Sequence, residues 1–154
     1  MQVSFHRPGA ALGDCVAGMV HFAGFLPDWQ REKLLPDGAM ELVVDLADRP
    51  KRLFRDETDP RGTDFRRAWI SGVHRRPIVI EAQPMAALLV ISFTPGGAYP
   101  FLGCDADALT DGVFALEDVL GRAAASLRDR VLEAGTPAAM FAAAEAWLRE
   151  RAGG

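Results

Sequence analysis

Two acids and one histidine in this chain have the side chains that acid–base chemistry requires. Glu41 lies in the strand-like segment 40–46, and a carboxylate in such an apolar setting holds its proton more readily than one in water. Asp37 lies shortly before it, in a turn formed by Pro36, Asp37 and Gly38, whose residue types each favour turn geometry. If the protein is an enzyme, we expect Glu41 or Asp37 to act as the acid or base, with His74 as its partner.

Ser71 is the candidate nucleophile, in the segment Ile-Ser-Gly-Val-His that ends at His74. This segment lacks the Gly-x-Ser-x-Gly elbow that exposes the serine of a hydrolase. Residues three apart on one strand also point to opposite faces. The pattern therefore favours a turn at Ser71-Gly72 and a loop containing His74 before Pro77, and we predict no catalytic residue.

The sequence predicts neither a bound metal nor a cofactor. Its three histidines, His6, His21 and His74, are scattered, and no His-x-His, His-Glu-x-x-His or Cys-x-x-Cys pattern occurs. The cysteines, Cys15 and Cys104, have no metal-type spacing, and we expect two reduced thiols.

Most aromatic residues of such a chain are expected in its core, and binding of a small molecule is the alternative for two of the tryptophans. Trp29 and Trp69 fall in the β-rich part of the chain, where they could line the mouth of a barrel that holds a small apolar or aromatic ligand. Together with Glu41 and His74 they make up the predicted ligand-binding residues.

The charge and hydropathy of the chain exclude some classes of protein. The formal net charge is −4 over 154 residues, whereas a nucleic-acid-binding domain usually carries a basic face. No apolar run approaches the length of about 20 residues that spans a bilayer, and the N-terminus lacks a signal pattern. We therefore expect a soluble, cytoplasmic protein without a membrane partner.

The chain divides into a β-rich part, about 1–103, and a helical part, 104–154. The alternation of Val16, Gly18, Val20 and Phe22 is typical of a strand with one buried face. The polar stretch 55–66 is expected to be an exposed loop. The predicted strands cover 16–25, 40–46, 51–54, 67–73, 77–82 and 87–94.

Two amphipathic helices are predicted in the second part, after a short helix at 106–111. The first begins near Glu117 and ends at Gly135, and the second begins at Thr136-Pro137. Both carry an apolar stripe, which either forms a dimer interface or packs on the β-rich part. The residues of this stripe predicted for dimerisation are Leu120, Leu127, Val131, Phe141, Trp147 and Leu148.

These elements predict one α+β domain over 1–154, in which a β-barrel or sandwich is followed by a C-terminal antiparallel helical hairpin. Short strands separated by turns, without helical spacers, argue against parallel α/β units. The helical part would serve as a linker or a dimerisation element.

Four landmarks carry a resemblance to a known family. They are Leu35-Pro36-Asp37-Gly38-x-x-Glu41-Leu42, Ser71-Gly72-x-His74-x-x-Pro77, Phe93-x-Pro95-Gly96-Gly97-Ala98 and Leu116-Glu117-Asp118-x-x-Gly121. Their order and spacing resemble the N-terminal sensor domain of a subgroup of bacterial AraC/XylS-type transcriptional regulators. The resemblance implies a cupin-like β domain, linker helices, and a C-terminal helix-turn-helix domain that binds DNA.

The DNA-binding half has no counterpart in this sequence. The resemblance therefore implies a non-catalytic regulatory domain that senses an unknown small-molecule effector or forms a homodimer through its C-terminal helices. DNA would be bound only by the absent C-terminal domain. Two alternatives are a small barrel enzyme that uses Glu41 or Asp37 with His74, and a stand-alone small-ligand binding protein or antagonist.

Overall fold

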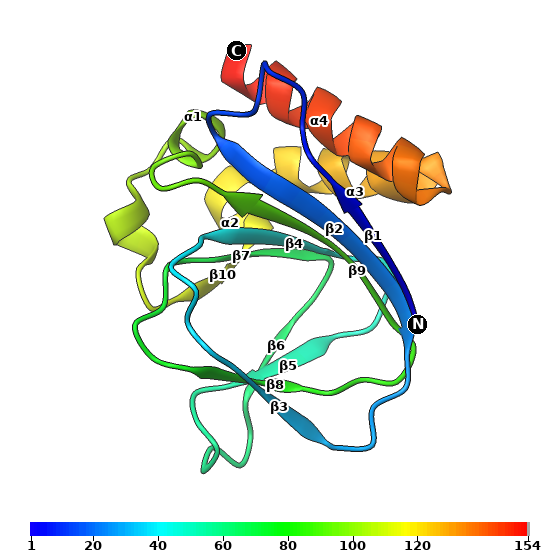
Figure 1. Cartoon of the computed structure of the whole chain (residues 1–154). Helices are drawn as coiled ribbons and strands as arrows, with labels where there is room; N and C mark the ends of the chain where they lie inside the picture. The colour runs from blue at the N-terminus through cyan, green and yellow to red at the C-terminus, as the bar shows by residue number, and fades with distance from the viewer. Residues whose placement is uncertain (154) are drawn as a thin grey trace.

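Two antiparallel sheets form the β-rich part of the chain in the computed structural model, which describes residues 1–153 (Figure 1). In order across the six-stranded sheet lie β1 (Gln2–His6), β2 (Val16–Phe25), β9 (Ala86–Phe93), β4 (Glu41–Asp45), β7 (Ala68–Ser71) and β10 (Val113–Ala115). In order across the four-stranded sheet lie β3 (Arg31–Leu34), β8 (Ile78–Glu81), β5 (Lys51–Phe54) and β6 (Thr63–Phe65).

This arrangement confirms the predicted α+β class and all six predicted strands. Four further strands, β1, β3, β6 and β10, were not predicted, and β6 lies within the stretch 55–66 that was expected to be a loop. The two sheets share no ladder of hydrogen bonds, so the described residues form no closed barrel.

Along a central strand of the six-stranded sheet, alternate side chains face either the helices or the space between the two sheets. On β4, Leu42 and Val44 are buried toward the helices, whereas Glu41 and Val43 face the four-stranded sheet. The period of two along a strand produces this separation. A central strand of this sheet therefore contacts the helical part with one face and the space between the sheets with the other.

The helical part covers one face of the six-stranded sheet (Figure 1). It contains α1 (Tyr99–Leu102), a 3₁₀ turn at Ala106–Leu109, α2 (Leu116–Leu120), α3 (Ala123–Ala134) and α4 (Pro137–Gly153). The indole Nε1 of Trp147, late in α4, donates to the carbonyl of Ala123 at the start of α3, at 3.1 Å. The predicted antiparallel hairpin of α3 and α4 is thus confirmed.

The prediction of one continuous helix from Glu117 to Gly135 is wrong, because the helix is broken at Gly121 into α2 and α3. Gly121 has φ 63° and ψ −133°, a backbone conformation that is essentially restricted to glycine. The break lets α2 end and α3 start in a new direction.

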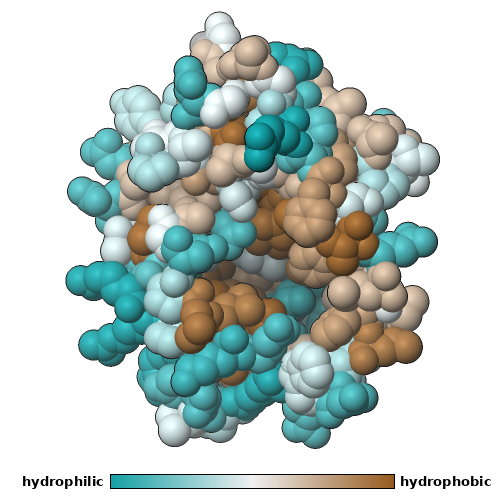
Figure 2. All heavy atoms as spheres, in the orientation of Figure 1, coloured by the Kyte–Doolittle hydropathy of each residue, from teal (hydrophilic) through white to brown (hydrophobic). Residues whose placement is uncertain are grey.

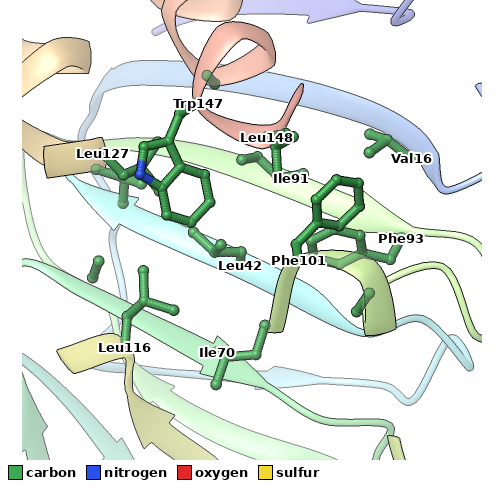
Figure 3. Close-up of a cluster of buried hydrophobic side chains, with 14 of the residues drawn as sticks. Val16, Leu42, Ile70, Ile91, Phe93, Phe101, Leu116, Leu127, Trp147 and Leu148 are labelled. Atoms are coloured by element: carbon green, nitrogen blue, oxygen red, sulfur yellow. The ribbon is translucent and has the colours of Figure 1, made fainter. Parts of the chain in front are cut away.

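The apolar stripe of the hairpin packs against the sheet of the same chain (Figure 3). Leu127, Val131, Phe141, Trp147 and Leu148 are all buried in the core, and Leu120 packs against it. Of the two expectations for this stripe, the structure supports packing on the β-rich part. Apart from the partly exposed Leu120, these side chains lie in the core of the same chain, and their contribution to a dimer stays a prediction.

Two smaller findings concern the membrane and the cysteines. No helix within residues 1–153 combines the length and the apolar character that a membrane crossing needs. Cys15 and Cys104 are both free thiols, as expected.

Candidate functional site

A cavity of about 540 Å³ lies between the two sheets. Its walls are mainly apolar side chains that alternate with core residues along the strands, including Val43 of β4, Trp69 of β7 and Leu88 and Val90 of β9. In Figure 2, apolar side chains surround a hollow in the middle of the visible face, between the positions of the two sheets. The volume falls in the range of about 300–1,000 Å³ that is typical of small-molecule sites.

Six polar side chains interrupt this apolar lining. They are Glu32, Glu41, Lys51, Ser71, Glu81 and Gln83. Neither Glu41 nor Lys51 takes part in any of the ion pairs within 4.0 Å that residues 1–153 form. The two charges that face the cavity most directly are therefore not neutralised by contact partners.

Lys51 is the most deeply buried cation of the chain, with 7% of its surface exposed. Burial lowers the pKa of its ammonium group, and the nearby carboxylates of Asp45, Glu32 and Glu81 oppose that shift. Asp45 is itself 3% exposed, and its Oδ2 has no hydrogen-bond partner among the described residues. Lys51 thus lies at an end of the cavity where three acids compensate its charge from beyond contact distance.

Glu41 occupies the other end of β4 and has a different environment. Burial raises the pKa of its carboxyl group, the nearby carboxylate of Asp37 raises it further, and a hydrogen bond opposes both effects. In that bond the hydroxyl of Ser92 donates to Oε2 at 3.2 Å. Asp37 is held by the turn predicted around it, where its Oδ1 accepts from the amide of Ala39 at 2.9 Å and Gly38 has φ 75°.

A smaller cavity of about 170 Å³ adjoins the Glu41 end. Asp37, Glu41, Ser71 and His74 all line it, and Glu41 and Ser71 also line the larger cavity. Glu41 and Ser71 are direct partners in the register of β4 and β7. The small cavity therefore collects every acid–base candidate that the sequence predicted.

Ser71 and His74 form a hydrogen bond, with Oγ and Nε2 2.7 Å apart. The expectation that they point to opposite faces is wrong, because β7 ends at Ser71 and His74 lies in the loop that follows. The amide of Gly72 donates to the carbonyl of Gly112 at 2.9 Å, which holds the start of this loop next to β10. The predicted loop holding His74 is confirmed, whereas Ser71 is the last residue of the strand and no turn forms at Ser71-Gly72.

The predicted ligand-binding residues are divided by the structure. Trp69 and Glu41 line the large cavity, and His74 lines only the small one. Trp29 lines neither, because it follows β2 at the surface, is 47% exposed and packs edge-on against Phe25 at 5.6 Å. Three of the four predicted side chains thus lie at the site.

Four polar residues of the cavity, Glu32, Lys51, Glu81 and Gln83, were not predicted from the sequence, and Lys51 is the most deeply buried of them. Its signal was present, because Lys51 and Leu53 are two apart on a predicted strand and must share a face. Leu53 lines the same cavity. A lysine two residues from an apolar residue on a strand lies on the same face, so its burial could have been predicted.

The fold and the site together define a class of protein: a two-sheet α+β domain with a ligand-sized cavity between its sheets and a helical hairpin behind the larger one. The chain belongs to the family described as Domain of unknown function (DUF6597), whose model matches residues 4–115. That match spans the strands from within β1 to β10 and ends before α2. No curated protein and no solved structure matches the chain.

Proposed function

We propose that this chain is a non-catalytic, ligand-sensing regulatory domain of the AraC/XylS type, with a cupin-like β part whose effector binds between the sheets. The single observation that carries the proposal is the cavity of about 540 Å³, with its apolar walls and few polar groups. The order of the four sequence landmarks adds the regulatory context. The domain would act on an attached DNA-binding domain.

The path from the cavity to the hairpin supports a sensing role. β4, β7 and β9 carry cavity residues and helix-facing core residues in strict alternation, so one backbone contacts both. On α3, Arg128 Nε donates to the carbonyl of Asp45 at 2.9 Å, next to the Lys51 end of the cavity. A ligand that shifts this end of β4 would bias the position of α3, which is how a ligand can change the population of two arrangements.

A homodimer through the C-terminal helices would have to use their outward faces. Leu132 on α3 is 39% exposed, unlike the buried stripe on the same helix. The proposed homodimer therefore does not depend on the six residues that the sequence predicted for dimerisation.

A thermal-shift screen against small organic molecules tests the sensing proposal, because a ligand that binds only the native state raises the Tm. The control is the double variant Val43→Phe/Val90→Phe, which places two larger side chains at register partners in the cavity wall. We expect at least one compound to raise the Tm of the wild type and to lose this effect in the filled variant. A screen in which every active compound stabilises both proteins equally would contradict the proposal.

A second candidate function is a small acid–base enzyme at Glu41, Asp37 and His74. It is favoured by one observation, the small cavity that holds all three side chains. The Glu41→Gln variant decides between the candidates, because it abolishes turnover in an enzyme. A sensor has no turnover, so the wild type and the variant would both be inactive.

A further inference from the structure

The charges around the cavity indicate what kind of ligand it takes, provided that the proposed sensing function holds. The ionisable side chains that line it are Glu32, Glu41, Glu81 and Lys51. A lining with more acids than bases favours a ligand that brings positive charge.

The two ends of the cavity differ in how well their charges are balanced. At one end, Asp45, Glu32 and Glu81 all act on Lys51 and offset its charge, although Arg49 opposes them. At the other end, the nearest charge that acts on Glu41 is Asp37, another carboxylate. The uncompensated charge of the cavity is therefore negative and lies at Glu41.

Distance decides whether Lys51 would prevent a cation from binding at Glu41. Asp45 and Glu41 are the two ends of β4, so their Cα atoms lie about 13 Å apart at the usual rise per residue of about 3.3 Å. Asp45 is among the groups that act on the pKa of Lys51, whereas Lys51 is not among those that shift the pKa of Glu41. Because the Coulomb interaction falls with distance, a cation at about 4 Å from Glu41 is attracted more strongly than a more distant charge repels it. The nearby carboxylate dominates.

An aromatic ring stands beside this carboxylate. Glu41 is paired with Ser71, and Trp69 lies two residues from Ser71 on the same face of β7. Diagonal neighbours of this kind are about 7–8 Å apart, within reach of one ligand group. A ligand cation at Glu41 is therefore also within reach of the Trp69 side chain, and a ring and a carboxylate together suit an organic cation better than a hydrated metal ion.

We propose that the cavity binds a small organic cation, an amine or quaternary ammonium compound with an apolar body. Its charged group lies against Glu41 and Trp69, and its body extends between the sheets toward Leu88 and Val90. The hydroxyl of Ser71, at the junction with the small cavity, can accept a hydrogen bond from a protonated amine.

Binding of a cation at Glu41 depends on pH. A bound cation stabilises the ionised form of Glu41, so binding weakens as the pH falls through the raised pKa of this carboxyl group, above its ordinary value of 4.5. Asp37 acts directly on Glu41, His74 lines the adjoining small cavity, and Glu32, Lys51 and Glu81 are the other titratable side chains of the large one. Of these, His74 also loses its proton within the usual working range, so the pH profile must be taken in the His74→Gln background as well.

The test uses two fluorescent probes, a cationic styrylpyridinium dye and the anionic dye anilinonaphthalene sulfonate. Wild type, Glu41→Gln and the filled variant Val43→Phe/Val90→Phe are titrated with each dye. The matched control is Glu133→Gln, which removes the same charge from the exposed face of α3. We expect Glu41→Gln to weaken the cationic dye roughly tenfold, the effect of one charge-assisted contact, with Glu133→Gln unchanged.

The outcomes separate this inference from the proposed function. The inference about charge is overturned if the cationic dye binds wild type and Glu41→Gln with equal affinity. It is also overturned if the wild type binds the anionic dye more tightly than the cationic one. If in that case the filled variant still blocks the dye, the sensing cavity stands. If neither dye binds, or if the filled variant binds both as well as the wild type does, both proposals fail.

Discussion

The hydroxyl of Ser71, at the end of β7, and the imidazole of His74, in the loop that follows, are joined by a hydrogen bond of 2.7 Å. Burial lowers the pKa of His74, and Asp111 and Asp37 oppose the shift without reversing it. The ring is therefore neutral at pH 7, and its Nε2 can accept from the Ser71 hydroxyl. No carboxylate of the described residues forms an ion pair with this ring, so the pair lacks the third member that orients a catalytic histidine.

We expect Ser71→Ala to lower the free energy of unfolding by about 0.5–1.5 kcal/mol, the contribution of one such hydrogen bond. Urea denaturation measures it, with Ser4→Ala on β1 as a control at a position outside the cavities lined by Ser71. We also expect ester hydrolysis by the wild type to equal that of Ser71→Ala. Hydrolysis that depends on both Ser71 and His74 would favour the enzyme over the sensor.

The raised pKa of Glu41 has a consequence for stability that can be measured without a ligand. The folded protein holds this proton to a higher pH than the unfolded chain, whose glutamate titrates near 4.5. The native state is therefore penalised as the pH rises from about this value through the folded pKa, and the penalty is complete above it. At low pH the carboxyl group is protonated in both states and the penalty vanishes.

Glu41→Gln should accordingly be more stable than the wild type at pH 7, and the difference should shrink as the pH is lowered toward 4. Thermal unfolding over this pH range tests the prediction. A variant that is less stable than the wild type at neutral pH would mean that the carboxylate has a favourable partner in the native state. Glu133→Gln provides the control for the change in net charge.

The buried stripe of the hairpin makes a clear prediction about oligomeric state. Leu127→Ala should lower the free energy of unfolding by about 2–5 kcal/mol, because Leu127 is fully buried and its truncation leaves a cavity. Leu132→Ala, at an exposed position on the same helix, should change it little. If light scattering instead shows that Leu127→Ala dissociates a folded dimer, the stripe is an interface after all.

The strands that the sequence predicted correctly are those with a strong apolar pattern. The segment 87–94 was found because β9 is buried on both faces, and 40–46 was found because a turn precedes it. The four missed strands, β1, β3, β6 and β10, are the edge strands of the two sheets, and none of their residues is fully buried. Pairing with neighbours, and not their own sequence, makes them strands.

The site was predictable to the extent that it depends on single strands. Glu41 and Trp69 were found because a carboxylate or an indole in an apolar segment needs an explanation. The proximity of Ser71 to His74 was not predictable, because it depends on where β7 ends and on the contact of Gly72 with Gly112. The sequence also did not decide whether the apolar stripe of the hairpin packs on the β-rich part or on a second copy. An amphipathic helix shows only which of its faces is buried and not what covers that face.

Gly121 offers a test of the break between α2 and α3. An alanine there meets no atom within 4 Å, so any effect of Gly121→Ala comes from the backbone conformation alone. We expect a loss of about 1–3 kcal/mol in the free energy of unfolding, the strain of a side chain in this region of φ and ψ. Gly9→Ala, which also meets nothing within 4 Å and has no positive φ, should be nearly neutral.

Arg128 connects α3 to the cavity end of β4, and its removal should separate ligand binding from the response of the helix. Its Nε donates to the carbonyl of Asp45 at 2.9 Å, and its Nη2 lies 3.5 Å from Asp48 Oδ1. Arg128→Met keeps the apolar stem and deletes these contacts, because the guanidinium is replaced by a thioether. A hydrogen bond from a charged donor contributes about 1.5–3 kcal/mol, so the variant should be less stable but still folded.

The informative measurement is hydrogen exchange of the α3 amides with and without the cationic styrylpyridinium dye. In the wild type we expect the dye to slow exchange in α3, and in Arg128→Met we expect the same dye affinity with a smaller change in α3. Arg122→Met, at an exposed position just before α3 that forms no ion pair in the described residues, is the matched control. An unchanged response of α3 in Arg128→Met would mean that the sheet itself, through Leu42 and Val44, carries the effect to the hairpin, because these side chains pack directly beneath the helices.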